Sequence, residues 1–426
     1  MNKIAFLIKS EKLFSIIKSL SFYFLLSDIL CWPILSYISF LPILVLCNII
    51  EYSTIGLAIF LFFLIFLRSK NNYVFKPILI FVLMTLYCVV VTLFLSKIDF
   101  DVIRFILKLI NCISIYFLTF TFGYEKKKLT ILAISFSFSV FLMFVSSIFY
   151  NLKTPGNLLQ AFTGGRYRLG MLENQPNGYG LFCIYSMIMI IYLAYHYEIK
   201  WFYLLALIPF SISFGTQSKK TMAIGLIVIS IALILFIKAM KNKKARIVCL
   251  ISIGVLTTVT GIILVTRTNI FSRLFSFGDN SDGSTFERIS MFSFAARDTR
   301  SYLIVGHGLN TFVLNFYRSY GTAYANPLIF HSSIGDLFYS SGIIGVALWL
   351  YFLYTTIIPK SNVKKGFFAL LITFFVIQII IDFTSQTWYN PSSFFMLGFV
   401  SSIKLNESFL SKKVFSKVDQ YYQINI

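Results

Sequence analysis

The chain has 426 residues, of which 58% are hydrophobic and 12% are charged, with a mean hydropathy of +0.82 and a formal net charge of +21. A soluble domain carries about twice that charged fraction, so the composition excludes an ordinary soluble protein. The positive charge lies mostly in short loops between apolar runs, where membrane topology explains it without a nucleic-acid partner.

Long apolar runs predict a polytopic, all-α membrane protein with about twelve transmembrane helices, since a span takes about 20 residues and only helices or closed barrels satisfy their backbone in lipid. The short alternating segments of a barrel are absent from the sequence. The expected spans are 22–48 (interrupted at Trp32-Pro33), 53–67, 77–96, 101–122, 129–150, 177–197, 201–216, 221–237, 247–266, 333–357, 366–384 and 390–404.

The distribution of basic residues predicts one integral membrane domain over residues 1–426 with both termini in the cytoplasm. Two polar segments, 151–176 and 267–332, are then a smaller and a larger periplasmic loop. The larger loop contains six arginines and no lysine, whereas the segments assigned to the cytoplasm use mainly lysine. A guanidinium grips phosphate or carboxylate through two parallel hydrogen bonds, so the arginines predict an anion site. Lipid headgroups or salt bridges to nearby carboxylates are the alternative.

The smaller loop ends in Gly164-Gly165-Arg166-Tyr167-Arg168-Leu169-Gly170, followed by Asn174-Gln175-Pro176-Asn177. Glycines with interleaved arginines and amides suit a loop that meets sugars and phosphates. A second outer turn, Thr216-Gln217-Ser218-Lys219-Lys220-Thr221, places two lysines at a predicted helix N-terminus, where the helix dipole repels them. An anion bound there would resolve the conflict, and simple tolerance of interfacial lysines is the alternative.

The larger loop contains a predicted amphipathic helix over about 285–300. Ser284 and Glu287 form a capping-box pattern, and Phe286, Ile289, Phe292 and Ala296 fall on one face. We expect this helix to lie on the membrane surface, with Arg288 beside its buried face and Arg297 and Arg300 together on another face.

Two histidines lie in the larger loop. His331 directly precedes a span; if Ser332 caps that helix, the dipole keeps the imidazole neutral and suited to general-base chemistry. Asp336, one turn later, could orient His331 or pair with an arginine. We expect His307, in Gly306-His307-Gly308, to sit in a turn.

These stretches together resemble the O-antigen polymerase and O-antigen ligase superfamily of bacterial inner-membrane glycan enzymes. The resemblance covers roughly residues 160–350. Four features carry it: the arginine/glycine segment running into 174–177, the turn 216–221, Gly306-His307-Gly308-Leu309-Asn310 after Arg288, and His331-Ser332 with Gly342-Ile343-Ile344-Gly345 following.

The resemblance implies glycosyl transfer at the periplasmic face of the bacterial inner membrane, without metal, nucleotide or other cofactor. An undecaprenyl-diphosphate-linked glycan would move to an acceptor hydroxyl as the lipid diphosphate leaves. The resemblance makes His331 the base and gives Arg288 and Lys219 catalytic roles at the diphosphate. Further substrate contacts are expected from Arg166, Arg168, Asn177, Lys220, Arg297, Arg300 and Asp336. Membrane lipid, a chain-length regulator and a flippase of the same pathway are the expected partners.

The acceptor separates two enzymatic hypotheses. A polymerase joins repeat units into O-antigen or capsular polysaccharide, and a ligase moves finished glycan onto lipid A–core. Lys219 stands where ligases carry an arginine, and Ser332 where they often carry an asparagine, which favours the polymerase. A lipid-linked glycan flippase is a third hypothesis. It would need charges at mid-membrane in broken helices, and only Arg104, Lys108 and Asp382 lie inside predicted spans.

Overall fold

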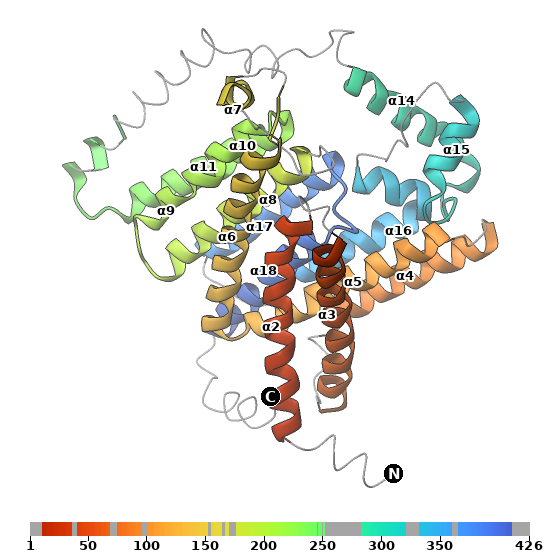
Figure 1. Ribbon diagram of the computed structural model, residues 1–426, viewed down its shortest axis with the longest axis horizontal. Coiled ribbons are helices and arrows are strands. Elements are labelled where there is room, and N and C mark those ends of the chain that lie inside the picture. The colour runs from red at the N-terminus through yellow and green to blue at the C-terminus, as the bar shows by residue number, and fades with distance from the viewer. Residues whose placement is uncertain are drawn as a thin grey trace. The chain divides into compact units, whose positions relative to one another are not determined.

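The structure, a computed structural model, describes residues 11–35, 41–68, 75–95, 100–151, 155–163, 167–169, 176–244, 246–248, 250–251, 283–320, 332–359 and 365–410. Within these ranges all regular elements are helices and no strand occurs (Figure 1). Eight of the described helices are long and apolar enough to cross a membrane. The protein is therefore an all-helical, multi-pass membrane protein, as the composition predicted.

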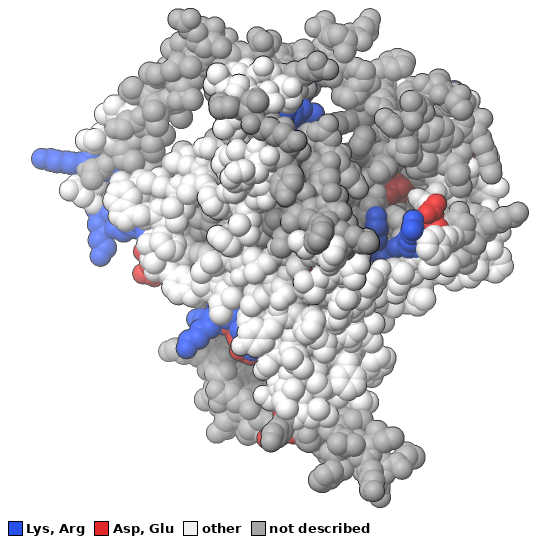
Figure 2. Space-filling view, viewed as in Figure 1, with Lys and Arg blue, Asp and Glu red and all other residues white. Residues whose placement is uncertain are grey.

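The surface agrees with this class. On the face drawn in Figure 2, most of the described surface carries neither Lys or Arg nor Asp or Glu, and the charged side chains gather in small groups. Large apolar side chains such as Phe94 and Ile304, which are 83% and 62% exposed, lie on this molecule's outside. Such surface is costly in water but matches the lipid tails of a bilayer.

The first two helices divide the N-terminal apolar region differently from the predicted spans. Helix α2 covers Glu11–Leu35 and helix α3 covers Leu41–Arg68. The predicted span 22–48 was therefore wrong, because it joined the end of α2 to the start of α3. Lys18 precedes the predicted span 22–48 in sequence, yet it lies within α2 and pairs with Glu125 at 2.9 Å.

Later spans agree in position but vary in length. The predicted span 201–216 consists of two short helices, α9 (Phe202–Leu205) and α10 (Leu207–Gly215). The predicted span 366–384 lies in helix α17 (Lys365–Thr384), whose apolar part, Phe368–Thr384, is shorter than the eight candidate spans. Most of the predicted span 247–266 lies outside the described residues. The total of twelve spans stays a prediction.

The chain divides into two compact units. The first unit comprises Met1–Leu25, Ile50–Leu129 and Asn280–Ile426, and the second comprises Leu26–Ile49 and Thr130–Asp279. The further described helices of the first unit are α4 (Lys76–Leu95), α5 (Phe100–Gly123), α14 (Gly283–Asp298), the 3-10 helix η1 (Thr299–Tyr302), α15 (Thr311–Tyr320), α16 (Ser333–Ile357), α17 (Lys365–Thr384) and α18 (Pro391–Leu410). Those of the second unit are α6 (Lys126–Asn151), α7 (Pro155–Thr163), α8 (Pro176–His196), α9, α10 and α11 (Lys219–Ala239).

The core of the first unit lies where α5 runs along α18 and where α16 packs between α4, α17 and α18. Small residues let α5 and α18 approach closely. A Cβ atom on Gly398 would lie 2.7 Å from the Tyr116 carbonyl oxygen, and one on Gly123 would lie 2.2 Å from Ser402 Oγ. Close approach through small residues is typical of helix pairs in membranes, where van der Waals packing holds helices together. This packing fixes the frame on which α16 is held.

Candidate functional site

Helix α16 is broken in its interior, at Gly342. This residue has φ +61° and ψ −162°, which no helical residue adopts. The break exposes peptide groups on both sides, and the segment 303–308 pairs with them. The hydrogen bonds are Ile343 N to Leu303 O (3.0 Å), Ile344 N to Ile304 O (3.5 Å), His307 N to Tyr339 O (2.9 Å) and Gly308 N to Ser340 O (2.9 Å). The two glycine motifs singled out in the sequence, 306–310 and 342–345, are thus partners in one structure.

This pairing has an energetic reason. An unpaired peptide group in the hydrocarbon region costs several kcal/mol, so a broken membrane helix persists only where other groups satisfy its backbone. Segment 303–308 supplies two acceptors and two donors at the break. This segment therefore holds His307 against the first half of α16. His307 lies in a turn, as predicted.

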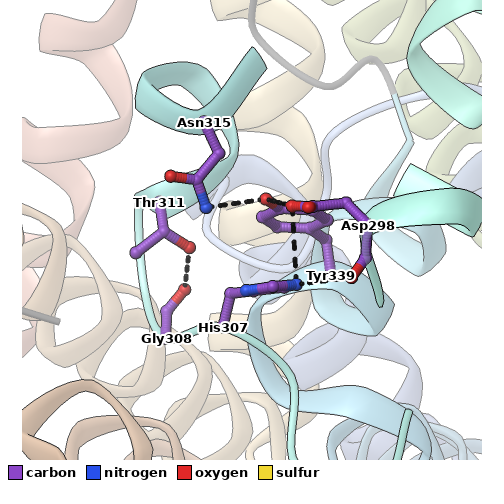
Figure 3. Close-up of polar contacts among 6 residues, drawn as sticks. All are labelled: Asp298, His307, Gly308, Thr311, Asn315 and Tyr339. Carbon is purple, nitrogen blue, oxygen red and sulfur yellow. Dashed lines mark hydrogen bonds and ion pairs between the residues drawn. The ribbon is translucent and has the colours of Figure 1, made fainter. Parts of the chain in front are cut away.

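A polar cluster forms around Tyr339, three residues before Gly342 (Figure 3). Its side chains come from α14, segment 303–308, α15 and α16. The Tyr339 hydroxyl on α16 donates to Asp298 Oδ2 at the end of α14, over 2.5 Å, and accepts from Asn315 Nδ2 of α15 at 2.8 Å. His307 Nε2 lies 3.5 Å from the same Asp298 oxygen and 3.3 Å from the Asp298 carbonyl oxygen. The Thr311 hydroxyl donates to the Gly308 carbonyl at 2.8 Å, and Thr311 is the first residue of α15.

Apolar packing supports this cluster from α14 and α15. Met291, Phe294, Ala295, Phe312, Phe316 and Tyr339 form one buried group. The predicted helix is confirmed as α14, but its packed side differs from the predicted face. Phe292, assigned to the buried face, is 44% exposed, whereas Phe294 is buried at 5%. The reason is that α15 and Tyr339 cover the neighbouring face. Ser284 lies within the first turn, because α14 begins at Gly283.

The predicted arginines of the larger loop lie along α14 and η1. Arg288 is in α14, and nothing of its side chain is described. Arg297 and Arg300 are exposed, on the last turn of α14 and on η1. Arg300 makes no hydrogen bond or ion pair with any residue of the described chain. The Asp298 carboxylate, the nearest carboxylate in sequence, is engaged by Tyr339 and His307 instead.

The start of α16 is confirmed as capped by Ser332, whose Oγ accepts from Gly335 N at 3.1 Å. His331 itself lies outside the described residues. Asp336 is buried and accepts from Trp388 Nε1 at 2.9 Å, and no arginine among the described side chains pairs with it. Burial of the neighbouring Tyr389, in the loop between α17 and α18, raises its pKa well above the usual range.

Asp382 anchors the same end of α16 from α17. Its carboxylate is fully buried and accepts from Trp349 Nε1 and Gln378 Nε2, each at 2.8 Å, and from the Thr387 hydroxyl. Its carbonyl accepts from the capping Ser332 hydroxyl at 3.3 Å. Asp382 therefore joins α17 to α16 and to the loop after α17, which fits a structural role for this buried carboxyl group.

In the second unit, the turn 216–218 connects α10 to α11 around Gln217. This residue has a left-handed φ of +48°, and its side chain is buried. Its amide nitrogen lies 3.1, 3.0 and 2.9 Å from the carbonyl oxygens of Gln160, Ala161 and Tyr167. Arg168 Nε donates to the Thr216 carbonyl at 2.9 Å and Nη2 to the Gln217 carbonyl at 3.3 Å. The two outer motifs of this unit are thus bound to each other.

The remaining predicted residues of the second unit lie at helix starts. Lys219 and Lys220 are partly exposed in the first turn of α11, and Asn177 is partly exposed in the first turn of α8. Arg166 lies outside the described residues. Arg166, Arg168, Asn177, Lys219 and Lys220 belong to the second unit, and Arg288, Arg297, Arg300, His331 and Asp336 to the first.

Sequence reasoning missed Asp298, Tyr339 and Asn315 as site residues. Asp298 is one of the carboxylates close to the arginines in sequence, which were considered only as salt-bridge partners, and Tyr339 lies inside the predicted span 333–357. A tyrosine at the level of a helix-breaking glycine was the one available signal. Among the described residues, no group of three or more His, Cys, Asp or Glu could hold a metal ion.

Comparison with protein-family models finds no family that matches this chain, and comparison with curated proteins finds no similar sequence.

Proposed function

We propose that this protein is a glycosyltransferase that polymerises undecaprenyl-diphosphate-linked repeat units at the periplasmic face of a bacterial inner membrane. The product would be O-antigen or capsular polysaccharide. The proposal combines the resemblance of residues 160–350 to O-antigen polymerases and ligases with the geometry of the first unit.

One observation carries the proposal. Arg300 is an exposed guanidinium without an intramolecular partner in the described chain, and it is followed by an exposed apolar stretch. Leu303, Ile304 and Val305 are 46%, 62% and 36% exposed. A cation beside apolar surface suits a ligand with a diphosphate on a lipid tail. Fixed cations also stabilise the negative charge that develops on a departing diphosphate.

In the proposed reaction, a sugar hydroxyl loses its proton to His331 and attacks the anomeric carbon of the donor. The bond from that carbon to the diphosphate oxygen breaks, and its electron pair leaves with the lipid diphosphate. Arg288 and Arg300 of the first unit would hold the diphosphate, and Arg297 would contact donor or glycan. For Lys219, Lys220, Asn177 and Arg166 of the second unit, contacts with the substrate are what the resemblance implies. Arg168 would act indirectly, by holding the backbone carbonyl of Thr216 in place. Asp336 would also act indirectly, by holding the indole of Trp388.

A flippase is the second candidate, and the break in α16 favours it. Transporters of lipid-linked substrates use broken helices and buried charges near mid-membrane, and Asp336 and Asp382 are buried in α16 and α17. However, the peptide groups at the break are bonded to segment 303–308, and both carboxylates are bonded to tryptophan indoles. These peptide groups and carboxylates are therefore bonded within the protein, so we favour the enzyme.

The test is reconstitution of the purified protein in nanodiscs with the lipid-linked repeat unit of its host, in EDTA. A ladder of glycan multiples on the carrier lipid supports the polymerase. Transfer only after lipid A–core is added supports the ligase. No transfer in either mixture, with movement of the substrate across proteoliposomes, would establish the flippase. A catalytic role for His331 requires that His331→Ala, folded to the same extent, lose transfer.

A further inference from the structure

The Nε2 atom of His307 faces two oxygen atoms of one residue. The Asp298 carbonyl oxygen is 3.3 Å away and the carboxylate Oδ2 is 3.5 Å away (Figure 3). A carbonyl oxygen only accepts hydrogen bonds, and this carboxylate oxygen already accepts from the Tyr339 hydroxyl. Nε2 must therefore carry the proton of the neutral ring, and the lone pair belongs to Nδ1.

The position of this ring is fixed from several sides. Its centroid lies 4.6 Å from that of Tyr339, in a stacked arrangement, and 4.7 Å from that of Tyr302. Its backbone nitrogen donates to the Tyr339 carbonyl at 2.9 Å. Asn315 holds the Tyr339 hydroxyl, and that hydroxyl holds the Asp298 carboxylate. Such a chain of hydrogen bonds orients an imidazole and selects its tautomer.

The Nδ1 atom is the second polar atom of the His307 ring. Within the described chain it makes no hydrogen bond, and the His307 side chain keeps 13% of its surface exposed. The contacts that hold the ring use Nε2, which faces Asp298, and the ring itself, which packs against Tyr302 and Tyr339. A fixed acceptor atom at the surface of a polar cluster instead suits a ligand that donates a hydrogen bond.

We propose that Nδ1 of His307 accepts a hydrogen bond from a hydroxyl group of the glycan, which makes His307 a substrate-binding residue. This inference rests on the proposed function, which supplies the glycan. Hydroxyl groups are the donors that sugars present most often. Tyr302, 40% exposed beside the imidazole, offers an aromatic face for the apolar side of a sugar ring. Arg300, two residues earlier, would hold the diphosphate of the same ligand.

The arrangement can be tested by nitrogen NMR without any activity. The chain has three histidines, so His196→Gln with His331→Gln leaves His307 as the only imidazole. In nanodiscs at about pH 8, we expect ¹⁵N spectra to show a protonated Nε2 and an unprotonated Nδ1. Asp298→Asn, which can donate from its amide, should move the lone pair toward Nε2. A neutral ring with its proton on Nδ1 before that change would overturn the assignment.

Ligand binding can be read in the same variant, which lacks the proposed base His331 and so should not turn over. Titration with the lipid-linked repeat unit should shift the Nδ1 resonance. Undecaprenyl diphosphate without sugar should leave that resonance in place. An equal shift with both lipids, or none with either, would sink the hydroxyl contact. A glycan-specific shift, together with wild-type protein that transfers no sugar, would keep this site and reject the transferase.

Kinetic measurements separate a substrate-binding role of His307 from a purely structural role. His307→Phe keeps an aromatic ring between Tyr302 and Tyr339 but removes both nitrogens. Loss of one hydrogen bond to a neutral group should raise the KM for the repeat unit about tenfold, with kcat changed less than about threefold. The melting temperature measured in parallel should fall only slightly, because the lost Nε2 contacts with Asp298 are long, at 3.3 and 3.5 Å. Unchanged KM in folded His307→Phe would show that the ring has only a structural part.

Discussion

Gly306 and Gly342 lie backbone to backbone at the break in α16. A Cβ atom on Gly306 would come within 2.4 Å of the Ser341 nitrogen, and one on Gly342 within 2.2 Å of the Ile304 carbonyl oxygen. Both residues also have positive φ, at +76° and +61°. Only glycine, which lacks a Cβ atom, allows this backbone conformation together with so close an approach. The two glycines therefore allow segment 303–308 to pair with the broken helix.

Alanine at Gly342 or Gly306 should therefore destabilise the protein. The left-handed conformation costs about 1–2 kcal/mol with a Cβ atom, and the forced shift of packed backbone about 1–3 kcal/mol more. Thermal unfolding in detergent measures the effect. Gly56→Ala in α3 is the matched control, because a Cβ atom there meets nothing within 4 Å. It should be neutral or stabilise by up to about 1 kcal/mol. Equal melting temperatures for Gly342→Ala and Gly56→Ala would contradict the tight pairing.

Gln217→Glu should be among the most damaging single changes in the second unit. The glutamate has the same shape, but its carboxylate would face three carbonyl oxygens in a buried site. A buried charge without a partner costs about 3–5 kcal/mol. Gln160→Glu makes the same chemical change on an exposed side chain and should alter stability by less than about 0.5 kcal/mol. Chemical unfolding of both variants decides the matter, and similar midpoints would show that the amide bonds contribute little.

Arg168 and Arg300 should respond in opposite ways to alanine. Arg168 bonds two backbone carbonyls, so Arg168→Ala should lower the free energy of unfolding by about 2 kcal/mol. Arg300 has no such bonds in the described chain, so Arg300→Ala should leave the melting temperature unchanged. Under the proposed function it should lower glycan transfer on the order of 100-fold, since it removes one cation from the diphosphate site. Stable, fully active Arg300→Ala would remove Arg300 from the site.

Asp382→Asn should weaken the anchor at the start of α16. The carboxylate accepts from two nitrogens and a hydroxyl, and an amide would turn its own NH₂ group toward one of those donors. One buried unsatisfied contact costs about 1–3 kcal/mol. Asp101→Asn is a suitable comparison, because Asp101 is 67% exposed and pairs with Arg104 at 3.8 Å. Its loss should be within about 0.5 kcal/mol. A wild-type melting temperature for Asp382→Asn would argue against the anchor.

Glu125 should make stability depend on pH in acid. Burial raises the pKa of its carboxyl, but hydrogen bonds and ion pairs with Lys128 and Lys18 outweigh burial and hold the pKa below its usual value of 4.5. Because the folded-state pKa is lowered, the stabilisation is complete above the unfolded value and is lost as pH falls through the folded value. Melting temperature should therefore drop below about pH 4.5, and Glu125→Gln should flatten that drop.

A matched lysine variant checks the cause. Lys128→Met removes the bonds at 2.9 and 2.8 Å to Glu125. The folded-state pKa of Glu125 should then rise toward the unfolded value, so the acid-dependent loss of stability should be smaller than in wild type. An unchanged pH profile in both Glu125→Gln and Lys128→Met would show that this pair does not contribute to acid stability.

The sequence by itself determined the class of the protein and several local elements. Apolar runs specify membrane helices because lipid leaves the backbone no other way to satisfy its peptide groups. The existence of helix α14 and the Ser332 cap of α16 followed from local patterns, because such patterns involve residues only a few positions apart. The N-terminal residue and the buried face of α14 did not follow, because α15 and Tyr339 decide which side of the helix is packed. The first span was misplaced because hydropathy does not show that Lys18 finds a carboxylate within the fold.

Only the tertiary structure decided which polar groups meet. Asp298 and Tyr339 are 41 positions apart, and the hydrogen bond between them depends on how α14 packs on α16. Likewise, Arg168 reads in sequence as a phosphate ligand, yet its guanidinium binds carbonyls 48 and 49 residues away. Local patterns set which residues share a helix face, whereas contacts across such separations follow from packing of whole helices. For that reason the break at Gly342 and its partner segment were visible only in three dimensions.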